Sequence, residues 1–312
     1  MSWVGVALLA HFINAIVFTV DKSLLSSGNS VVGNPAKYAA LSGLVAAGAA
    51  VVLPFGFALP NQFVVAWSLA AGLAWILALW LFFVALKEGE SSRVVPLAGS
   101  AVPVFTLVIA AIFLGEALTG QQLWAVAALI AGGALLSIEF VGTTRLPKHV
   151  LLAAVGSGLA FATYFVIVDG IYERFGPFVS AFAYSRLGVG FVALLLLIWV
   201  LKNERGASSK PGTRKATKRL SFTRAGIIIS AAFVGSKVLA AVALILQNYA
   251  ISLGSVSVVN ALQGTQYAFL LVLAFIISHQ FPKLFREEVG RVALGQKIAG
   301  IAVIGLGLVL LV

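Results

Sequence analysis

The chain has 312 residues, of which 61% are hydrophobic and only 10% are charged, and its net charge is +11. A soluble protein carries about 25% charged residues, and a soluble chain of this length must expose a large share of its side chains to water. These values exclude a water-soluble protein. Because the chain has no cysteine, a disulfide framework and a metal–thiolate site are also excluded.

Ten apolar segments are long enough to cross a bilayer, since a helix of roughly 20 apolar residues spans the hydrocarbon core. In chain order the predicted spans are 3–20, 38–57, 64–86, 94–114, 121–140, 150–168, 178–201, 225–246, 256–277 and 294–312. The first segment lacks a basic region and a small-residue cleavage site, which favours a span over a signal peptide. The sequence therefore predicts an all-α integral membrane protein with ten transmembrane helices.

The two halves of the chain resemble each other. GQQLWAVAALIAGGALL (120–136) aligns with GQKIAGIAVIGLGLVLL (295–311) near the end of each half. This similarity predicts two repeats, which comprise residues 1–141 and 149–312. Each repeat holds five spans, an odd number, so the second copy must insert into the membrane in the inverted orientation.

The positions of the basic residues indicate the orientation, since Lys and Arg in short loops lie in the cytoplasm. Nearly all of the 21 Lys and Arg follow or flank the ends of the odd-numbered spans, and Arg174 is alone in the opposite set. Both termini are therefore expected on the non-cytoplasmic side of the cell membrane. The basic segment 202–224 is expected to be a disordered cytoplasmic loop that lies near anionic lipid headgroups, and nucleic acid is not an expected partner.

Two stretches resemble a known family. They are VVPLAGSAVPVFTLVIAAIFLGEALTGQQLWAVAALIAGGALLS (94–137) and YSRLGVGFVALLLL, with its early arginine, and both are similar to the EamA-like branch of the drug/metabolite transporter superfamily. The second copy departs from the pattern, because SHQ at 278–280 replaces the LGE of 114–116. The resemblance covers nearly the whole chain. It implies a secondary transporter of small metabolites without a bound cofactor, and it does not identify the substrate.

Two cations lie deep in predicted spans, where a charge is costly and usually functional. Lys237 and Arg186 lie about 12 and about eight residues into their spans, and the aligned residues of the first repeat are Gly72 and Leu44. Either cation could attract a carboxylate or phosphate, which predicts an anionic or zwitterionic solute. Alternatively, Arg186 is structural and bonds helix-end carbonyls or pairs with Asp169, and Lys237 exchanges a proton that couples transport.

Other polar and aromatic side chains are candidates for a substrate path near the bilayer midplane, where transporters with inverted repeats bind their solutes. These candidates are His11, Asn14, Trp75, Tyr164, Asn260, Gln263 and Gln266. The alternatives are a packing role for His11, interhelical hydrogen bonds for the polar stripe of the ninth span, and an interfacial position for the aromatic rings. Asp21 and Asp169 occupy equivalent span ends. They are candidates for gating salt bridges, Asp169 with Arg174 or Arg186.

Two rival classes of protein lack their characteristic sequence features. The chain contains no HExxH, G-x-S-x-G or P-loop motif and no pair of deep carboxylates, so an enzyme is not predicted. A passive channel would need a continuous polar pore or filter loops. The prediction is therefore a secondary active transporter that works by alternating access, as a monomer or homodimer and without a metal. The alternative is a passive channel or a membrane protein without transport activity.

Overall fold

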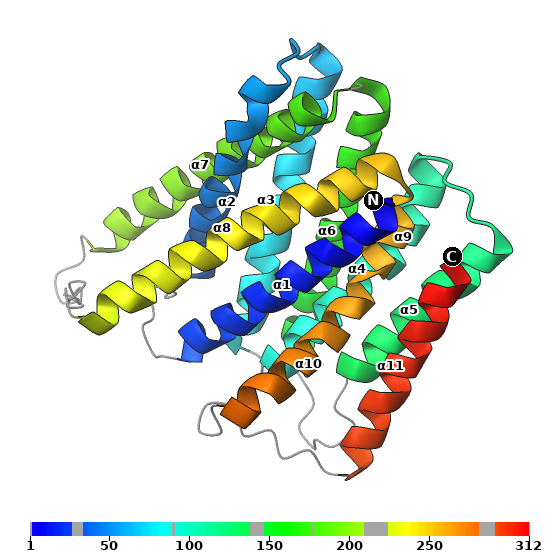
Figure 1. Cartoon of the computed structure of the whole chain (residues 1–312). Coiled ribbons are helices and arrows are strands. Elements are labelled where there is room, and N and C mark those ends of the chain that lie inside the picture. The colour runs from blue at the N-terminus through cyan, green and yellow to red at the C-terminus, as the bar shows by residue number, and fades with distance from the viewer. Residues whose placement is uncertain are drawn as a thin grey trace.

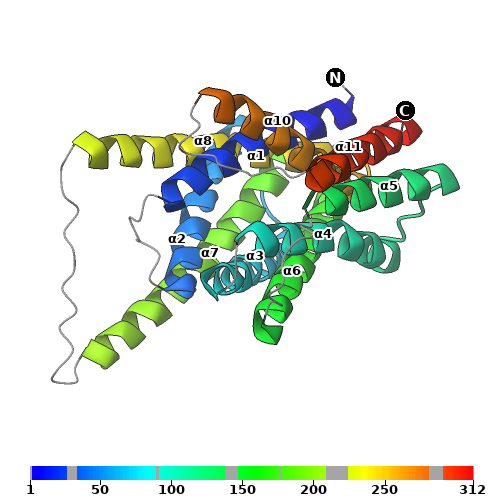
Figure 2. The same cartoon turned by 90° about the horizontal axis from the view of Figure 1, so that it is seen from below.

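The computed structural model describes residues 2–26, 34–88, 91–137, 147–175, 177–208, 224–280 and 291–311. These residues form eleven α-helices and one 3-10 helix, and no strand occurs among them, which confirms the all-α prediction. Figures 1 and 2 show helices packed side by side in one bundle, with both chain termini at the same end.

Local sequence signals mark the first residues of two of the helices. In chain order they are α1 (Trp3–Ser26), α2 (Pro35–Ala47), η1 (Gly48–Phe55), α3 (Gln62–Glu88), α4 (Ser91–Phe113), α5 (Gly120–Ser137), α6 (Lys148–Phe175), α7 (Phe178–Ser208), α8 (Arg224–Leu253), α9 (Val256–Ala261), α10 (Gln263–Gln280) and α11 (Arg291–Leu311). Asn34 caps α2 by accepting a hydrogen bond from the Ala36 N–H at 3.0 Å, and Pro35 follows at the first helical position, as is usual at helix starts. Ser255 caps α9 in the same way, by accepting from the Val258 N–H at 3.0 Å.

Five described segments are long and apolar enough to cross a membrane. They are Pro35–Phe55, Gln62–Glu88, Lys148–Phe175, Phe178–Asn203 and Val234–Leu253. Shorter apolar helices occur at Trp3–Val17, Leu97–Phe113, Gly120–Leu135 and Ile298–Leu310. Large apolar side chains such as Trp124 and Ile112 point out of the bundle and are mostly exposed. Exposed apolar surface of this extent is typical of a protein whose solvent is lipid.

The two ends of the bundle differ in character. At one end, here called the terminal end, α1 begins and α11 finishes, and Gly254 after α8 packs on the Trp3 ring. At the opposite end, here called the basic end, His149 Nε2 of α6 lies 2.6 Å from Glu88 Oε2 of α3. Lys87 and Lys148 adjoin these two residues in the sequence, so the described residues of this end include basic side chains.

Helices α3 and α7 make backbone contact. They run in the same direction and meet at Gly72 and Gly188, where a Cβ atom added to Gly72 would lie 2.4 Å from the Gly188 carbonyl oxygen. A Cβ atom added to Gly188 would lie 2.0 Å from the Ser68 carbonyl oxygen. Glycine at both positions is therefore what lets these two membrane helices approach so closely.

The predicted ninth span is not one continuous helix. The chain breaks at Leu262, between α9 and α10. The Leu262 carbonyl accepts hydrogen bonds from the Thr265 backbone N–H at 2.9 Å and from Thr265 Oγ1 at 2.6 Å. These bonds satisfy a polar group that the break removes from the regular helical ladder. All six residues of α9 are buried.

Two other boundaries also differ from the prediction. The second span ends as the 3-10 helix η1, which contains Pro54, a residue that cannot donate to the helical ladder. Helix α7 continues to Ser208, so the first residues of the predicted loop 202–224 are helical. Residues 209–223 lie outside the described part of the chain.

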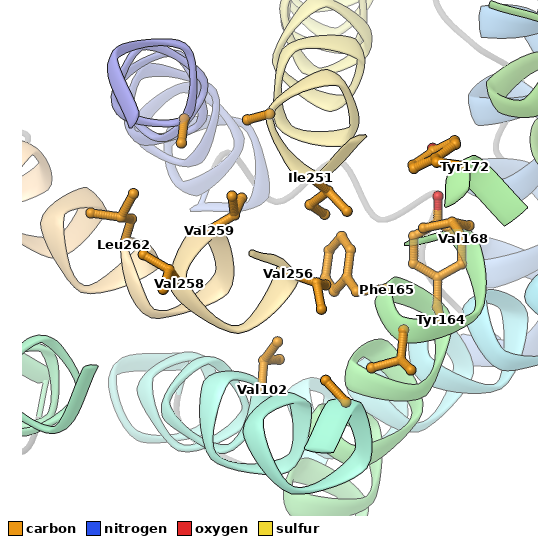
Figure 3. Packing of buried hydrophobic residues seen from close by; sticks show 14 of the residues in the cluster. Val102, Tyr164, Phe165, Val168, Tyr172, Ile251, Val256, Val258, Val259 and Leu262 are labelled. Carbon is orange, nitrogen blue, oxygen red and sulfur yellow. The ribbon is translucent and has the colours of Figure 1, made fainter. Parts of the chain in front are cut away.

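The main apolar core surrounds α6, which is the most buried of the candidate spans. Figure 3 shows Phe165 and Val168 of α6 beside Ile251 of α8, with Val256 and Val259 of α9 nearby. The core therefore joins both halves of the chain around one central helix.

Candidate functional site

The side chain of Arg186 lies in the interior of the bundle and is fully buried. Its guanidinium carbon is 4.7 Å from the ring centre of Tyr164, 5.0 Å from that of Trp75 and 5.6 Å from that of Phe182. These three rings are here called the aromatic cage. They come from α6, α3 and α7, so residues of both halves of the chain enclose the cation.

The Arg186 guanidinium has no hydrogen-bond partner on Nε, Nη1 or Nη2 among the described residues. Within this part of the chain, Arg186 bonds neither a helix-end carbonyl nor Asp169, the two partners of its structural alternative. Removing a charge from water costs several kcal/mol, whereas one desolvated cation–π contact contributes about 2 kcal/mol. The cage offsets part of this cost, and the five N–H groups still lack acceptors.

Tyr164 connects the cage to α8. Its ring packs edge-on against Trp75, with ring centres 4.6 Å apart, and its hydroxyl donates to Asn248 Oδ1 at 3.2 Å. Tyr172, two turns farther along α6, donates to the same Asn248 oxygen at 2.8 Å. The Asn248 amide Nδ2 donates to the Leu244 carbonyl at 2.8 Å. These hydrogen bonds fix the side chains of Tyr164, Tyr172 and Asn248 relative to one another.

A second group of polar side chains joins α8, α9 and α1. Gln247 Nε2 donates to Asn260 Oδ1 at 3.4 Å, and His11 Nε2 lies 3.1 Å from the Val259 carbonyl oxygen. Within the described residues, Asn260 Nδ2 and His11 Nδ1 are buried without a partner. Because Gln247 and Asn248 are adjacent, α8 links this group to the aromatic cage.

Lys237 lies near the middle of α8, on the same helical face as Leu244 and Asn248. It is about three turns from Asn248 in the direction of the basic end, and its side chain is half-buried. Val234, one turn before Lys237, and Val238, which follows it, are each 59% exposed. Lys237 therefore lies on the face of α8 that carries Asn248, beside exposed apolar side chains.

The remaining predicted residues are distributed around these groups. Gln266 is buried, whereas Asn14 and Gln263 are half-buried. Gln263 borders a small cavity of about 10 Å³ between α4, α5 and the α9–α10 break, which has room for about one water molecule. Asp169 is buried and makes no ion pair among the described residues. The side chain of Asp21 lies outside the described residues, so its gating role stays a prediction.

Several residues of this region were not singled out from the sequence. Phe182 completes the cage, and it lies four residues before Arg186 on one helix face, a spacing that could have predicted the contact. Ser257 of α9 donates a hydrogen bond to Glu116 Oε2, in the turn after α4, near the terminal end. The only signal for this bond was the LGE stretch that contains Glu116.

Among the described residues, no group of three His, Cys, Asp or Glu side chains is placed to hold a metal ion. The arrangement offers a buried guanidinium, aromatic faces and side-chain amides. Such groups suit the binding of a small organic solute, because pockets of this kind combine apolar walls with a few fixed polar groups.

Comparison with known proteins identifies relatives of the chain. The model of the EamA-like transporter family matches residues 1–138 and 148–286. A solved crystal structure has a TM-score of 0.61 at 17% sequence identity, and the match covers 96% of this chain and 98% of that chain. At this identity the likeness concerns the fold alone. No curated protein matches the chain.

Proposed function

Since the chain belongs to the EamA-like transporter family and is a multi-pass membrane protein of the transporter type, we propose that it is a secondary active carrier of a small metabolite. It would lie in the cell membrane with both termini on the non-cytoplasmic side, as the loop charges predict. Its solute would be anionic or zwitterionic and would bind between the two repeats, near Arg186.

The pattern of helix contacts supports two inverted five-helix repeats. Helix α6 packs on α3 and α4, and its predicted counterpart α1 packs on α8 and α10. The pairs α2–α7 and α5–α11 each join one helix to its predicted counterpart. Contacts that recur in this way are what a two-fold axis in the membrane plane would produce.

One pair of helices departs from this symmetry and supports alternating access. Helices α3 and α7 meet at Gly72 and Gly188, in the half of each helix nearer the terminal end. The counterparts α8 and α2 make no comparable contact among the described residues, and Lys237 aligns with Gly72 on α8. We infer that the structure is closed at the terminal end and more open at the basic end. A carrier would alternate between this state and its mirror counterpart.

The single observation that carries the proposal is the buried Arg186 guanidinium, which lies between the two halves of the chain and has no acceptor among the described residues. In membrane proteins such a charge marks a solute or ion pathway. A merely structural arginine would be expected to bond carbonyls or carboxylates, and this one bonds neither among the described residues.

The test is transport by purified protein in liposomes. A carrier shows counterflow: vesicles loaded with unlabelled solute accumulate labelled solute transiently above its outside concentration. A passive channel equilibrates the label without this overshoot. If a panel of metabolites gives neither counterflow nor equilibration, while the protein remains folded, the transporter function is wrong for this chain.

A further inference from the structure

The buried polar atoms without partners in and beside the aromatic cage are hydrogen-bond donors. Among the described residues they are Nε, Nη1 and Nη2 of Arg186 and Nε1 of Trp75. A guanidinium and an indole can only donate. A ligand that satisfies this cluster must supply acceptors.

The single positive charge of Arg186 favours a ligand group that carries a single negative charge. The cage residues Trp75, Tyr164 and Phe182 are uncharged, so Arg186 contributes one positive charge in an apolar surrounding. A carboxylate carries one negative charge, and its two oxygens match the parallel N–H groups of a guanidinium. A phosphate group carries about −1.5 to −2 at pH 7, which would leave an uncompensated negative charge out of water.

We propose that Arg186 in its aromatic cage binds a carboxylate group of the solute, and that a phosphate or phosphonate group is not its ligand. This inference rests on the proposed transporter function and narrows its substrate class. The apolar remainder of the solute would contact the aromatic rings, which belong to the main apolar core.

The experiment measures binding to the purified full chain in lipid nanodiscs by calorimetry and by thermal melting. The probes are two matched sets: acetate against acetamide, and benzoate against benzamide and phenylphosphonate. Acetate or benzoate is expected to bind and to raise the melting temperature. The amides and the phosphonate are expected to bind about tenfold or more weakly, because each lacks the charge or carries too much.

Variants assign the binding to Arg186. Arg186→Gln should weaken binding of the carboxylates about 10- to 100-fold, the loss expected for charge-assisted hydrogen bonds. It should not lower the melting temperature of the ligand-free protein, since it removes a buried charge without a partner. Arg186→Lys keeps the positive charge but lacks the parallel N–H groups of the guanidinium, and it should give intermediate affinity. The control is Lys202→Gln, which changes an exposed basic residue of the same helix and should bind like the wild type.

Three results would overturn the inference. They are equal binding of benzoate and benzamide, tighter binding of phenylphosphonate, and undiminished carboxylate binding by folded Arg186→Gln. Failure to bind any carboxylate would also overturn it, even if counterflow of another solute upheld the transporter function. Conversely, specific carboxylate binding that depends on Arg186, without transport of any carboxylate, would uphold the site and refute the carrier function.

Discussion

The contact between α3 and α7 provides a direct test of the proposed closed end. In the variant Gly188→Ala, the new Cβ atom would lie 2.0 Å from the Ser68 carbonyl oxygen and 2.5 Å from the Ser68 carbonyl carbon. These are backbone atoms, so no side-chain rotation can relieve the overlap. The two helices must part by about 1 Å or more to reach ordinary contact distances.

This separation destabilises the state that is closed at the terminal end. Overpacking of a well-packed interior typically costs about 1–3 kcal/mol. If the opposite state does not contain this contact, the ratio of the two states shifts by about 5- to 150-fold toward it. A carrier that must visit both states should then transport more slowly.

Chemical labelling can measure this shift because the natural chain contains no cysteine. Ser185→Cys places one thiol beside Arg186 at a buried position of α7. In oriented liposomes, Gly188→Ala should raise the rate at which a membrane-impermeant maleimide labels this thiol from the terminal end. The matched control is Gly235→Ala on α8, where an added Cβ meets no atom within 4 Å, and labelling should not change.

Two results would refute this reasoning. If Gly188→Ala and Gly235→Ala label and melt alike, the close contact between α3 and α7 does not exist as described. If Gly188→Ala melts at lower temperature but its labelling from the terminal end is unchanged, the contact is structural and not part of a gate.

Three further predictions concern other parts of the molecule. Lys237→Ala should abolish transport with expression intact, whereas Lys202→Ala at an exposed position of α7 should not; normal transport by the first variant would exclude Lys237 from the solute path. Ser257→Ala removes the hydrogen bond to Glu116 and should lower stability by about 1.5–3 kcal/mol, the usual contribution of a bond to a charged acceptor; an unchanged denaturation midpoint would contradict this. A fluorescent protein that requires the cytoplasm, fused after the last residue, should remain dark, and fluorescence would overturn the predicted orientation.

Helix positions could be predicted from the sequence because lipid imposes a simple rule: an apolar run must satisfy its own backbone as a helix. The breaks could not be predicted. The helix breaks at Leu262, whose carbonyl accepts hydrogen bonds from Thr265. A threonine within an apolar run does not predict such bonds. The extension of α7 to Ser208 also depends on backbone geometry that composition does not reveal.

The candidate site shows the same division between local and tertiary information. The depth of Arg186 follows from its place in an apolar run, and Phe182 follows from helical spacing. Trp75 and Tyr164 were candidates for the substrate path, but their position around the guanidinium depends on how α3 and α6 pack against α7. Asn248 gains its role only because two tyrosines of α6 reach one oxygen atom.

The internal repeat explains why a structural role for Arg186 is hard to sustain. The aligned position of the first repeat is Leu44, which is half-buried among apolar neighbours in the contact between α2 and α7. The same helical register is therefore compatible with an apolar side chain, and replacing a buried charge by an apolar residue is often neutral or stabilising. Stability alone would thus favour leucine at position 186 as well. The arginine occurs in one repeat only, in a cage that stabilises its charge, and its N–H groups have no acceptors among the described residues. A solute that supplies those acceptors accounts for both features.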